Sequence, residues 1–400
     1  MEARLLIPLA RQDVRPEDVE AVADVLASGR LALGPWTQRF EEHLANYVGV
    51  EHAVAVNSGT SALHLVIRAL DIGPGDEVIT TPFSFIASTN CILFERATPV
   101  FADIDSETYC IDPAAVERAV TSRTKAILAV DVFGRAADWP ALKAIADRHC
   151  IDLVDDSAEA LGSDLGDRRC GSFGRAGVFG LYPNKQITAG EGGAVVTDDQ
   201  GLAAVCRSMA NQGRSPENQW LQHVRLGYNY RMDEMSAALG CSQLARIEEI
   251  VEARAEVAAW YADALDGIEG LILPTCSVDG RTSWFVYVIR LSADYAKEDR
   301  DAILRDLTDR GIGCGDYFQP IHLQPFVRES LGTRAGMCPV TEAVGERTIA
   351  LPFYVGLTRA EVDRVAGVMR ELLDSRGPRR LRGGGGLGFF SLTWSSSRAR

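Results

Sequence analysis

Short apolar segments alternate with segments of helical character through residues 53–154 of the chain. The apolar segments are residues 53–56, 77–80, 99–102, 126–130 and 151–154. The helical segments are residues 61–70, 84–94, a stretch after 113, and 139–149. This regular alternation predicts a mostly parallel sheet with helices on both faces. Ligands bind such sheets beyond the carboxyl ends of the strands, so the residues that follow the strands are candidates for a site.

A long helical stretch from residue 233 to about 265 contains few helix breakers, and we expect it to lead into a smaller second domain. Residues 284–291 predict a strand there, and 297–310 and 358–373 predict helices. The expected organisation is a large domain over 1–245 with an N-terminal helical segment, and a small C-terminal domain over 246–375. Residues 376–400 carry six arginines, no acids and a glycine run, which predicts a disordered tail.

Charge and cysteine content argue against several classes of function. The formal net charge is -14, whereas nucleic acids and anionic membranes reward clustered Lys and Arg, so neither is an expected partner. The nine cysteines are scattered, which indicates reduced thiols in a cytoplasmic protein and no metal site. No apolar run approaches the ~20 residues that span a bilayer, and the first residues do not resemble a signal peptide.

Residues 57–63, Asn-Ser-Gly-Thr-Ser-Ala-Leu, lie between a predicted strand and a predicted helix. The N–H groups of a first helical turn are unpaired, and small residues such as Gly59 and Thr60 let a phosphate approach them. Simple capping of the helix by Ser58 or Thr60 gives the same pattern. Both interpretations stay open on this segment alone.

Two acids, Asp155 and Asp156, stand at the end of the predicted strand 151–154. A carboxylate at the end of a buried strand is costly unless a positive group meets it. A protonated pyridine nitrogen would suit, because an ionised partner gives a short, strong hydrogen bond. Capping of the next helix is the alternative, and it fits Asp155 better than it fits both acids.

Lys185 stands between an apolar run that begins at Phe179 and a glycine-rich turn that ends at Gly193. The preceding residues can desolvate the amine, while the glycines let a bulky group approach the backbone. Those conditions suit an amine that forms Schiff bases. A solvated lysine on a flexible loop is the ordinary alternative.

A phosphate cradle, a carboxylate and a lysine about 30 residues further on follow the chain order of pyridoxal 5'-phosphate (PLP) enzymes. From residue 7 to 373 the chain closely resembles the DegT/StrS group of sugar aminotransferases. The resemblance rests on five motifs in family order, at residues 57–63, 73–79, 156–162, 182–188 and 226–234. It implies an α/β protein of the PLP-dependent transferase fold type I, the aspartate-aminotransferase-like fold. Its large domain would hold a mostly parallel seven-stranded sheet flanked by helices, and its smaller C-terminal domain would be α+β.

The resemblance also implies roles for single residues. Lys185 would form the Schiff base with the cofactor and carry the proton shift, and Asp156 would keep the pyridine nitrogen protonated. Gly59 and Thr60 would hold the phosphate. Phe85 aligns with the aromatic residue that stacks on the cofactor ring, although an ordinary core phenylalanine is its general alternative.

Asn229 resembles the residue that reaches the neighbouring subunit's phosphate, which implies a homodimer with a shared active site. Glu159 stands near the cofactor's phenolic oxygen, where many relatives carry His or Gln. It should be protonated or turned away from that oxygen to avoid like-charge repulsion. Tyr182 is beside the lysine, and Tyr317 and His322 lie in a segment that borders the sugar in relatives. For these three residues both packing and substrate contact stay open.

Two positions refine the expected chemistry. Gly180 stands where many members carry a serine that reaches the phosphate, so one hydroxyl contact is lost and binding would depend more on Thr60 and Asn229. The family also contains dehydratases that replace the lysine, and Lys185 argues against that activity.

The expected function is an aminotransferase that moves an amino group from L-glutamate to a nucleotide-linked keto sugar. Glu159 favours C4 of a 4-keto-6-deoxyhexose, because relatives that make 4-amino-4,6-dideoxy sugars can carry Glu there. A 3-keto sugar or a keto-cyclitol is the alternative substrate that the shared motifs leave open. A regulatory or scaffold protein that keeps the fold is a further alternative, although it would need neither Lys185 nor Asp156.

Overall fold

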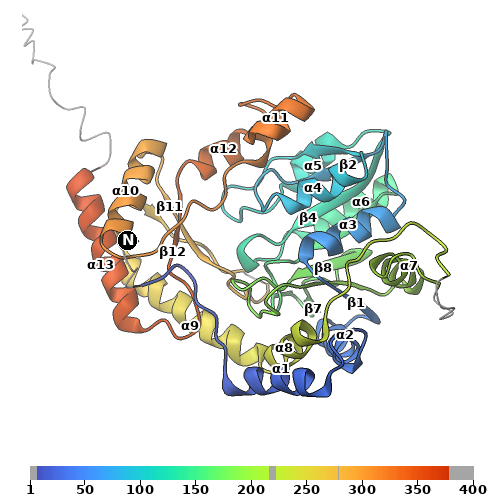
Figure 1. Ribbon diagram of the computed structural model, residues 1–400. Helices are drawn as coiled ribbons and strands as arrows, with labels where there is room; N and C mark the ends of the chain where they lie inside the picture. The colour runs from blue at the N-terminus through green and yellow to red at the C-terminus, as the bar shows by residue number, and fades with distance from the viewer. Residues whose placement is uncertain (1–6, 216–221, 278, 378–400) are drawn as a thin grey trace, which may run out of the picture.

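Seven strands form the large sheet of the computed structural model, which describes residues 7–215, 222–277 and 279–377 (Figure 1). Their order is β1 (His52–Val56), β9 (Gly193–Thr197), β8 (Ala176–Gly180), β5 (Asp152–Asp156), β4 (Thr124–Val130), β2 (Glu77–Thr80) and β3 (Thr98–Phe101). Within this sheet β9 runs antiparallel to both of its neighbours, and the other pairs are parallel. The predicted mostly parallel α/β sheet is therefore confirmed.

Helices cover both faces of this sheet. They are α2 (Pro35–Val48), α3 (Gly59–Ala69), α4 (Ala87–Phe94), α5 (Pro113–Ala119), α6 (Trp139–His149) and α7 (Gln200–Ala210). Strand β1 shows why the strands read as continuous apolar runs. Its Val54 and Val56 pack into the core shared with α3 and α7, while Ala53 and Ala55 pack against α2 on the other face. When both faces of a strand are buried, the residues on each face are apolar, so apolar and polar residues do not alternate along the strand.

A smaller three-stranded sheet and its helices form the second unit, drawn in yellow to red in Figure 1. The strands are β10 (Leu271–Ile272), β11 (Tyr287–Leu291) and β12 (Thr348–Leu351), all antiparallel. The helices after residue 246 are α9 (Ile247–Leu265), α10 (Lys297–Asp309), α11 (Pro325–Leu331), α12 (Pro339–Gly345) and α13 (Arg359–Arg376). Short elements complete the chain: β6 (Asp164–Leu165), β7 (Arg168–Arg169), and the single turns η1 (Val132–Gly134) and η2 (Ile321–Leu323).

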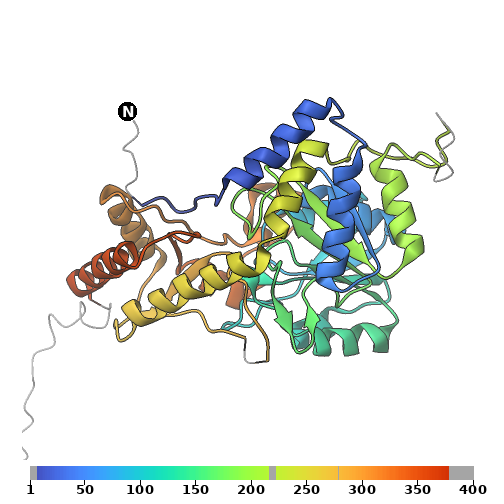
Figure 2. The same ribbon diagram turned by 90° about the horizontal axis from the view of Figure 1, so that it is seen from below.

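The predicted long helix over 233–265 is two helices, α8 (Glu234–Leu244) and α9, and α9 runs from the large unit into the smaller one (Figure 2). The break falls at Arg246, which bonds Asp13 and Asp18 from the N-terminal segment. Helix α1 (Pro16–Ser28) lies against α8. The local sequence contains no helix breaker that would predict this break. The partners that hold Arg246 are more than 220 residues away in the chain.

The first described residues belong with the smaller unit, although the predicted boundaries place 1–245 in the large domain. Ile7 pairs with Ile312 and is buried in the core of the smaller unit. Phe353 N–H donates to Leu9 C=O (2.9 Å). From Ile7 onward the chain therefore leaves the smaller unit, forms the large sheet, and returns to the smaller unit through α9. Of the expected tail, residues 378–400 lie outside the described residues.

A search of the described residues finds neither a helix long and apolar enough to cross a membrane nor a group of three or more His, Cys, Asp and Glu that could hold a metal ion.

Candidate active site

A cavity of about 520 Å3 lies where β1, β5 and β8 end, between the large sheet and the smaller unit. Because parallel strands end at one edge of a sheet, segments distant in sequence meet there. The cavity brings together eight of the predicted site residues: Gly59, Thr60, Phe85, Asp156, Glu159, Tyr182, Lys185 and Tyr317.

The N-terminus of α3 forms one wall of the cavity. Ser58 caps the helix by accepting a hydrogen bond from Ser61 N–H (3.1 Å). The strand ends press closely against this helix start: a Cβ on Gly59 would lie 3.2 Å from Gly180 Cα, and one on Gly193 would lie 2.5 Å from Gly59 N. Helix capping by Ser58 is therefore observed, and it leaves room for an anion at Gly59 and Thr60, which line the cavity at the first turn of the helix.

Asp156, the last residue of β5, is only 4% exposed. Its carboxylate accepts a hydrogen bond from Ala158 N–H (3.2 Å). Burial raises its pKa to about 7; the charge of Glu159 adds to this increase, and Lys185 opposes it. A buried carboxylate with so little support is costly. A ligand that presented a positive group to Asp156 would lower this pKa and supply the missing partner.

The amine of Lys185 lies inside the cavity rather than in solvent, with 15% of the side chain exposed. Its Nζ is 4.0 Å from the centre of the Phe285 ring and 3.5 Å from Glu159 Oε1. Lys185 follows the turn in which its N–H donates to Tyr182 C=O (2.9 Å). The solvated-loop alternative is wrong in this structure.

Glu159 is turned toward the protein rather than left free in the cavity. Its Oε2 accepts a hydrogen bond from Phe133 N–H (3.0 Å), and its Oε1 faces Lys185. Burial raises the pKa of Glu159, and the nearby charge of Lys185 opposes that increase. Two contacts therefore fix where this carboxylate points.

Aromatic side chains make up much of the remaining wall. Phe85 is 63% exposed and Tyr182 is 53% exposed, and both line the cavity. An exposed ring at a cavity wall is a surface that a ligand can cover. Phe85 is thus not the core phenylalanine of its alternative interpretation. Tyr317 also lines the cavity and stands edge-on to Phe285 (6.3 Å between ring centres).

Two predicted site residues are not brought to this cavity. His322 is fully buried, and its Nε2 lies 2.9 Å from Glu342 Oε1, so packing rather than substrate contact is its role within this chain. Its ring stands 6.2 Å from that of Phe101. Asn229 is exposed and outside the lining of the cavity; its C=O accepts a hydrogen bond from the Asn57 side chain (3.5 Å).

The lining contains residues that were not predicted from the sequence, among them Phe285, Phe318 and Asn184. Phe285 and Phe318 come from the smaller unit, and nothing local marks them among other apolar residues. Asn184 sits next to Lys185, and its Oδ1 is buried without a hydrogen-bond partner within the described ranges. The position of Asn184 inside the lysine motif was the available signal, because a polar side chain beside a reactive amine can contact the ligand.

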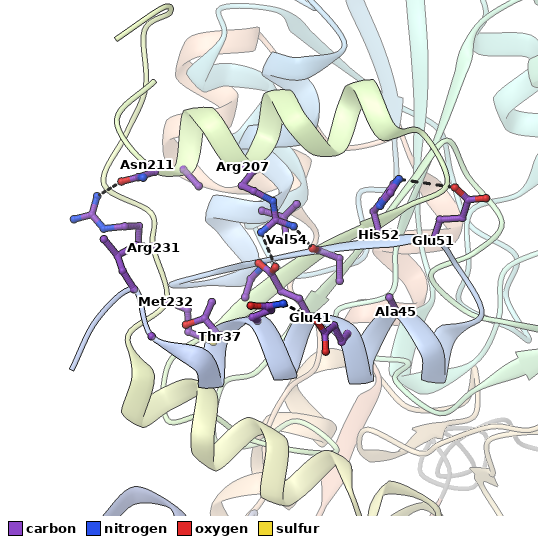
Figure 3. Close-up of a pocket in the computed structure, with 17 residues that line it drawn as sticks. Thr37, Glu41, Ala45, Glu51, His52, Val54, Arg207, Asn211, Arg231 and Met232 are labelled. Atoms are coloured by element: carbon purple, nitrogen blue, oxygen red, sulfur yellow. Dashed lines mark hydrogen bonds and ion pairs between the residues drawn. The ribbon is translucent and has the colours of Figure 1, made fainter. Parts of the chain in front are cut away.

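A second hollow, of about 700 Å3, lies beside β1 between α2 and α7 (Figure 3). Arg207 donates hydrogen bonds to the Glu41 carboxylate (2.5 Å) and to Ala53 C=O (2.8 Å), and Ala55 N–H donates to Glu41 (2.9 Å). These contacts occupy main-chain groups that an edge strand leaves open. The hollow holds none of the predicted site residues, so the cavity at the strand ends is the candidate active site.

Comparison with known proteins shows the family to which the chain is similar. The profile of the DegT/DnrJ/EryC1/StrS aminotransferase family matches residues 12–370. GDP-perosamine synthase of Caulobacter vibrioides is 37% identical over 343 residues, covering 86% of this chain and 91% of that protein. The crystal structure of S. venezuelae DesV is 36% identical with a TM-score of 0.86, covering 91% and 98% of the two chains. Helicobacter pylori PseC, an aminotransferase involved in the biosynthesis of pseudoaminic acid, is 30% identical with a TM-score of 0.88, covering 92% and 99%.

Proposed function

This chain belongs to the DegT/DnrJ/EryC1/StrS aminotransferase family, and we propose that it transfers an amino group from L-glutamate to C4 of a nucleotide-linked 4-keto-6-deoxyhexose. It is a PLP-dependent aminotransferase of fold type I. The observation that carries the proposal is the cavity, in which a weakly supported buried carboxylate and a half-buried amine meet at a helix N-terminus.

The residues of the cavity fit PLP on three observations. Asp156 lacks the positive partner that a protonated ring nitrogen would provide. Phe85 exposes its ring at the cavity wall, and the glycine at position 59 keeps the helix start open to a phosphate. We assign Gly59 and Thr60 to the phosphate, Asp156 to the ring nitrogen, Phe85 to the ring face and Lys185 to the reactive carbon. When bound, the cofactor supplies a sink for the electrons left behind as the amino donor loses a proton.

Lys185 is the proton carrier of the proposal. Its amine ends a flexible four-carbon stem, so it can take a proton from the donor's carbon and return one to the acceptor. Glu159 is held by Phe133 N–H and faces Lys185, so its carboxylate has a fixed direction, and a proton on it would avoid like-charge repulsion with the cofactor's phenolic oxygen. The aromatic wall of Phe285 and Phe318 excludes water from the reacting atoms.

The substrate assignment draws on three observations. GDP-perosamine synthase is named for a GDP-linked sugar and shares 37% of its residues with this chain over the matched length. Glu159 occupies the position at which the resemblance links Glu to 4-amino-4,6-dideoxy sugars. Tyr182 and Tyr317 line the cavity and present rings and hydroxyl groups suited to a sugar. A 3-keto sugar or keto-cyclitol acceptor is the competing assignment.

We also propose that the active site is completed by a second copy of the chain. Tyr228 and Tyr230 stack on each other (4.8 Å) and contact His64, which fixes the segment between them. The Tyr230 hydroxyl lies 3.0 Å from His64 Nδ1, and His64 Nε2 lies 2.8 Å from Glu95. Asn229, between the two tyrosines, is left exposed, as a residue that serves a partner's phosphate must be.

The test is the visible spectrum of the purified protein with PLP, before and after L-glutamate. A band near ~420 nm that gives way to one near ~330 nm is expected, and Lys185→Ala should lower turnover by at least ~10^3-fold. The amino-charged enzyme is then offered a nucleotide-linked 4-keto-6-deoxyhexose, a 3-keto sugar and a keto-cyclitol. Fastest return of the first band with the 4-keto sugar supports the assignment. A protein that stays colourless with PLP would instead support the scaffold alternative.

A further inference from the structure

The free amine of Lys185 is held by two groups that approach it from different parts of the chain. Phe285, from the segment leading into β11, lies beneath the amine with its ring centre 4.0 Å from Nζ. Glu159, from the segment after β5, places Oε1 3.5 Å from the same nitrogen. Phe285 is 2% exposed and Glu159 4%, so both contacts are sheltered from water. We call the Phe285 ring and the Glu159 carboxylate together the ammonium site.

One residue sets the spacing of the ammonium site through its backbone. Phe133 N–H donates to Glu159 Oε2 (3.0 Å), and Phe133 C=O accepts from Phe285 N–H (3.2 Å). Phe133 achieves this in a left-handed conformation with φ 59°, an uncommon state for a residue with a side chain. Gly134 follows with φ 88°, and a Cβ there would lie 2.8 Å from Trp284 N. The turn therefore joins the two walls at a close and defined distance.

A buried arginine ties the same wall to the lysine's own backbone. Arg254 of α9 donates to Trp284 C=O (3.1 Å), Phe285 C=O (3.3 Å) and Lys185 C=O (3.2 Å). The main chains of Phe285 and Lys185 are thus held by one guanidinium.

The chemistry of the two groups suits a lysine that must be released and used again. The face of an aromatic ring attracts an ammonium ion without accepting its proton. A sheltered carboxylate adds attraction of opposite charge, which is stronger away from water. A free lysine stem has several rotatable bonds, so an amine without such partners would spend much of its time away from the reacting atoms.

We propose that Phe285 and Glu159 hold the ammonium group of Lys185 whenever the lysine is not bonded to the cofactor, which makes Phe285 a catalytic residue contributed by the smaller unit. The proposal rests on the aminotransferase function above, since only that chemistry sets Lys185 free during turnover. It extends the site to a residue that none of the sequence motifs includes.

The experiment measures how readily Lys185 is acylated in the full-length protein freed of cofactor. The protein is treated with a small succinimidyl ester at one fixed pH, and the modified Lys185 peptide is followed by mass spectrometry. Loss of the ring in Phe285→Leu, or of the charge in Glu159→Gln, should raise the acylation rate, by roughly thirty-fold for the ring, the scale of a sheltered cation–π contact. Phe285→Tyr keeps the ring and should restore the wild-type rate.

Phe318→Leu is the matched control, because Phe318 lines the same cavity but its ring stacks on Phe133 (5.3 Å). It removes the same number of carbon atoms and should leave the Lys185 acylation rate near the wild-type value. If Phe285→Leu and Phe318→Leu gave equal rates, the ammonium site would be refuted and general loosening of the cavity would explain the change.

A kinetic measurement separates this proposal from the function it rests on. With PLP bound, Phe285→Leu should lower the limiting rate constant of the L-glutamate half-reaction and leave the apparent dissociation constant of L-glutamate close to wild type, because the ring contacts the lysine and not the donor. Normal spectral conversion together with an unchanged acylation rate and an unchanged limiting rate constant would overturn the ammonium site alone. Failure of the wild-type protein to bind PLP or react with L-glutamate would overturn the proposed function.

Discussion

The carboxyl groups of Asp131 and Asp155 approach the same hydroxyl group, that of Ser157. Ser157 Oγ lies 2.7 Å from Asp131 Oδ2 and 2.6 Å from Asp155 Oδ1. A hydroxyl has one hydrogen and can donate to only one of them. All three side chains are fully buried, and Asp155 and Ser157 stand on either side of Asp156 in the chain. One carboxyl group must therefore keep its proton, and burial raises the pKa of Asp155 well above its usual range.

Asp155→Asn should flatten the pH dependence of stability. The raised pKa means that folded Asp155 keeps a proton that the unfolded chain releases above about pH 4, so wild-type stability falls as pH rises, by about 1.4 kcal/mol per pH unit for one proton. The amide introduced by this substitution can donate to Ser157 and still accept from Gly171 N–H, which lies 2.7 Å from the wild-type carboxyl group. Urea unfolding at pH 5 and pH 8 measures the slope. Equal slopes for the variant and the wild type would show that Asp155 holds no extra proton.

Gly180→Ser should tighten cofactor binding by roughly ten-fold, the scale of a hydrogen bond to a charged group. A Cβ at Gly180 would meet its nearest atoms at 3.5 Å (Ala158 Cβ), 3.7 Å and 3.8 Å, which is ordinary contact, so the side chain fits. The serine restores the phosphate-reaching hydroxyl that many family members carry. Gly180→Ala adds the Cβ without the hydroxyl and is the control. Titration of the cofactor-free proteins with PLP gives the dissociation constants, and equal values for the Ser and Ala variants would contradict a phosphate at this position.

Mixed dimers of Lys185→Ala and Asn229→Ala subunits should recover activity that neither variant has alone. If Asn229 serves the partner's site, a mixed dimer carries both defects in one site and none in the other. Random pairing makes half of the dimers mixed, so activity should reach about one quarter of wild type. Turnover measured after co-refolding of the two variants tests this. Recovery no greater than the sum of the separate variants would place Asn229 in its own chain's site.

Arg207→Met should destabilise the protein by about 1–3 kcal/mol, because it leaves the Glu41 carboxylate buried beside β1 without its partner. Glu41 is 9% exposed and also accepts Ala55 N–H. In the double variant Glu41→Gln with Arg207→Met, the amide oxygen can still accept Ala55 N–H and no charge is buried. Urea unfolding of both should show the double variant to be the more stable. The reverse order would mean that the two side chains act independently.

Local chemistry explains which site residues could be predicted from the sequence. Asp156 ends strand β5 and Lys185 follows strand β8 within a few residues, and the parallel sheet alone brings such positions together. His322 and Tyr317 share one loop, yet only Tyr317 lines the cavity. The direction of the His322 side chain is set by its hydrogen bond with the Glu342 carboxylate, which comes from another helix. The sequence of the loop around His322 does not indicate where that helix packs.

Long-range contacts explain what the sequence could not show. Phe285 reaches Lys185 because the smaller unit is bound to the turn at Phe133. The local sequence around an apolar residue that precedes a strand does not indicate which side chain it will contact. The helix break at Arg246 has the same origin, since Asp13 and Asp18 hold it from the other end of the chain. Patterns of neighbouring residues predict elements, whereas these contacts depend on how the elements meet.

The pairing of Ile7 with Ile312 has a consequence for biosynthesis. Ile7 N–H donates to Gly311 C=O (3.1 Å), and Gly313 N–H donates to Ile7 C=O (2.8 Å). During translation the ribosome makes Ile7 some three hundred residues before Gly311 and Gly313. The segment that contains Ile7 therefore has no pairing partner while the large sheet is synthesised and begins to fold. The smaller unit is then assembled last, from segments that lie some three hundred residues apart. A nascent chain halted before residue 311 would leave Ile7, and the core that receives it, exposed to chaperones.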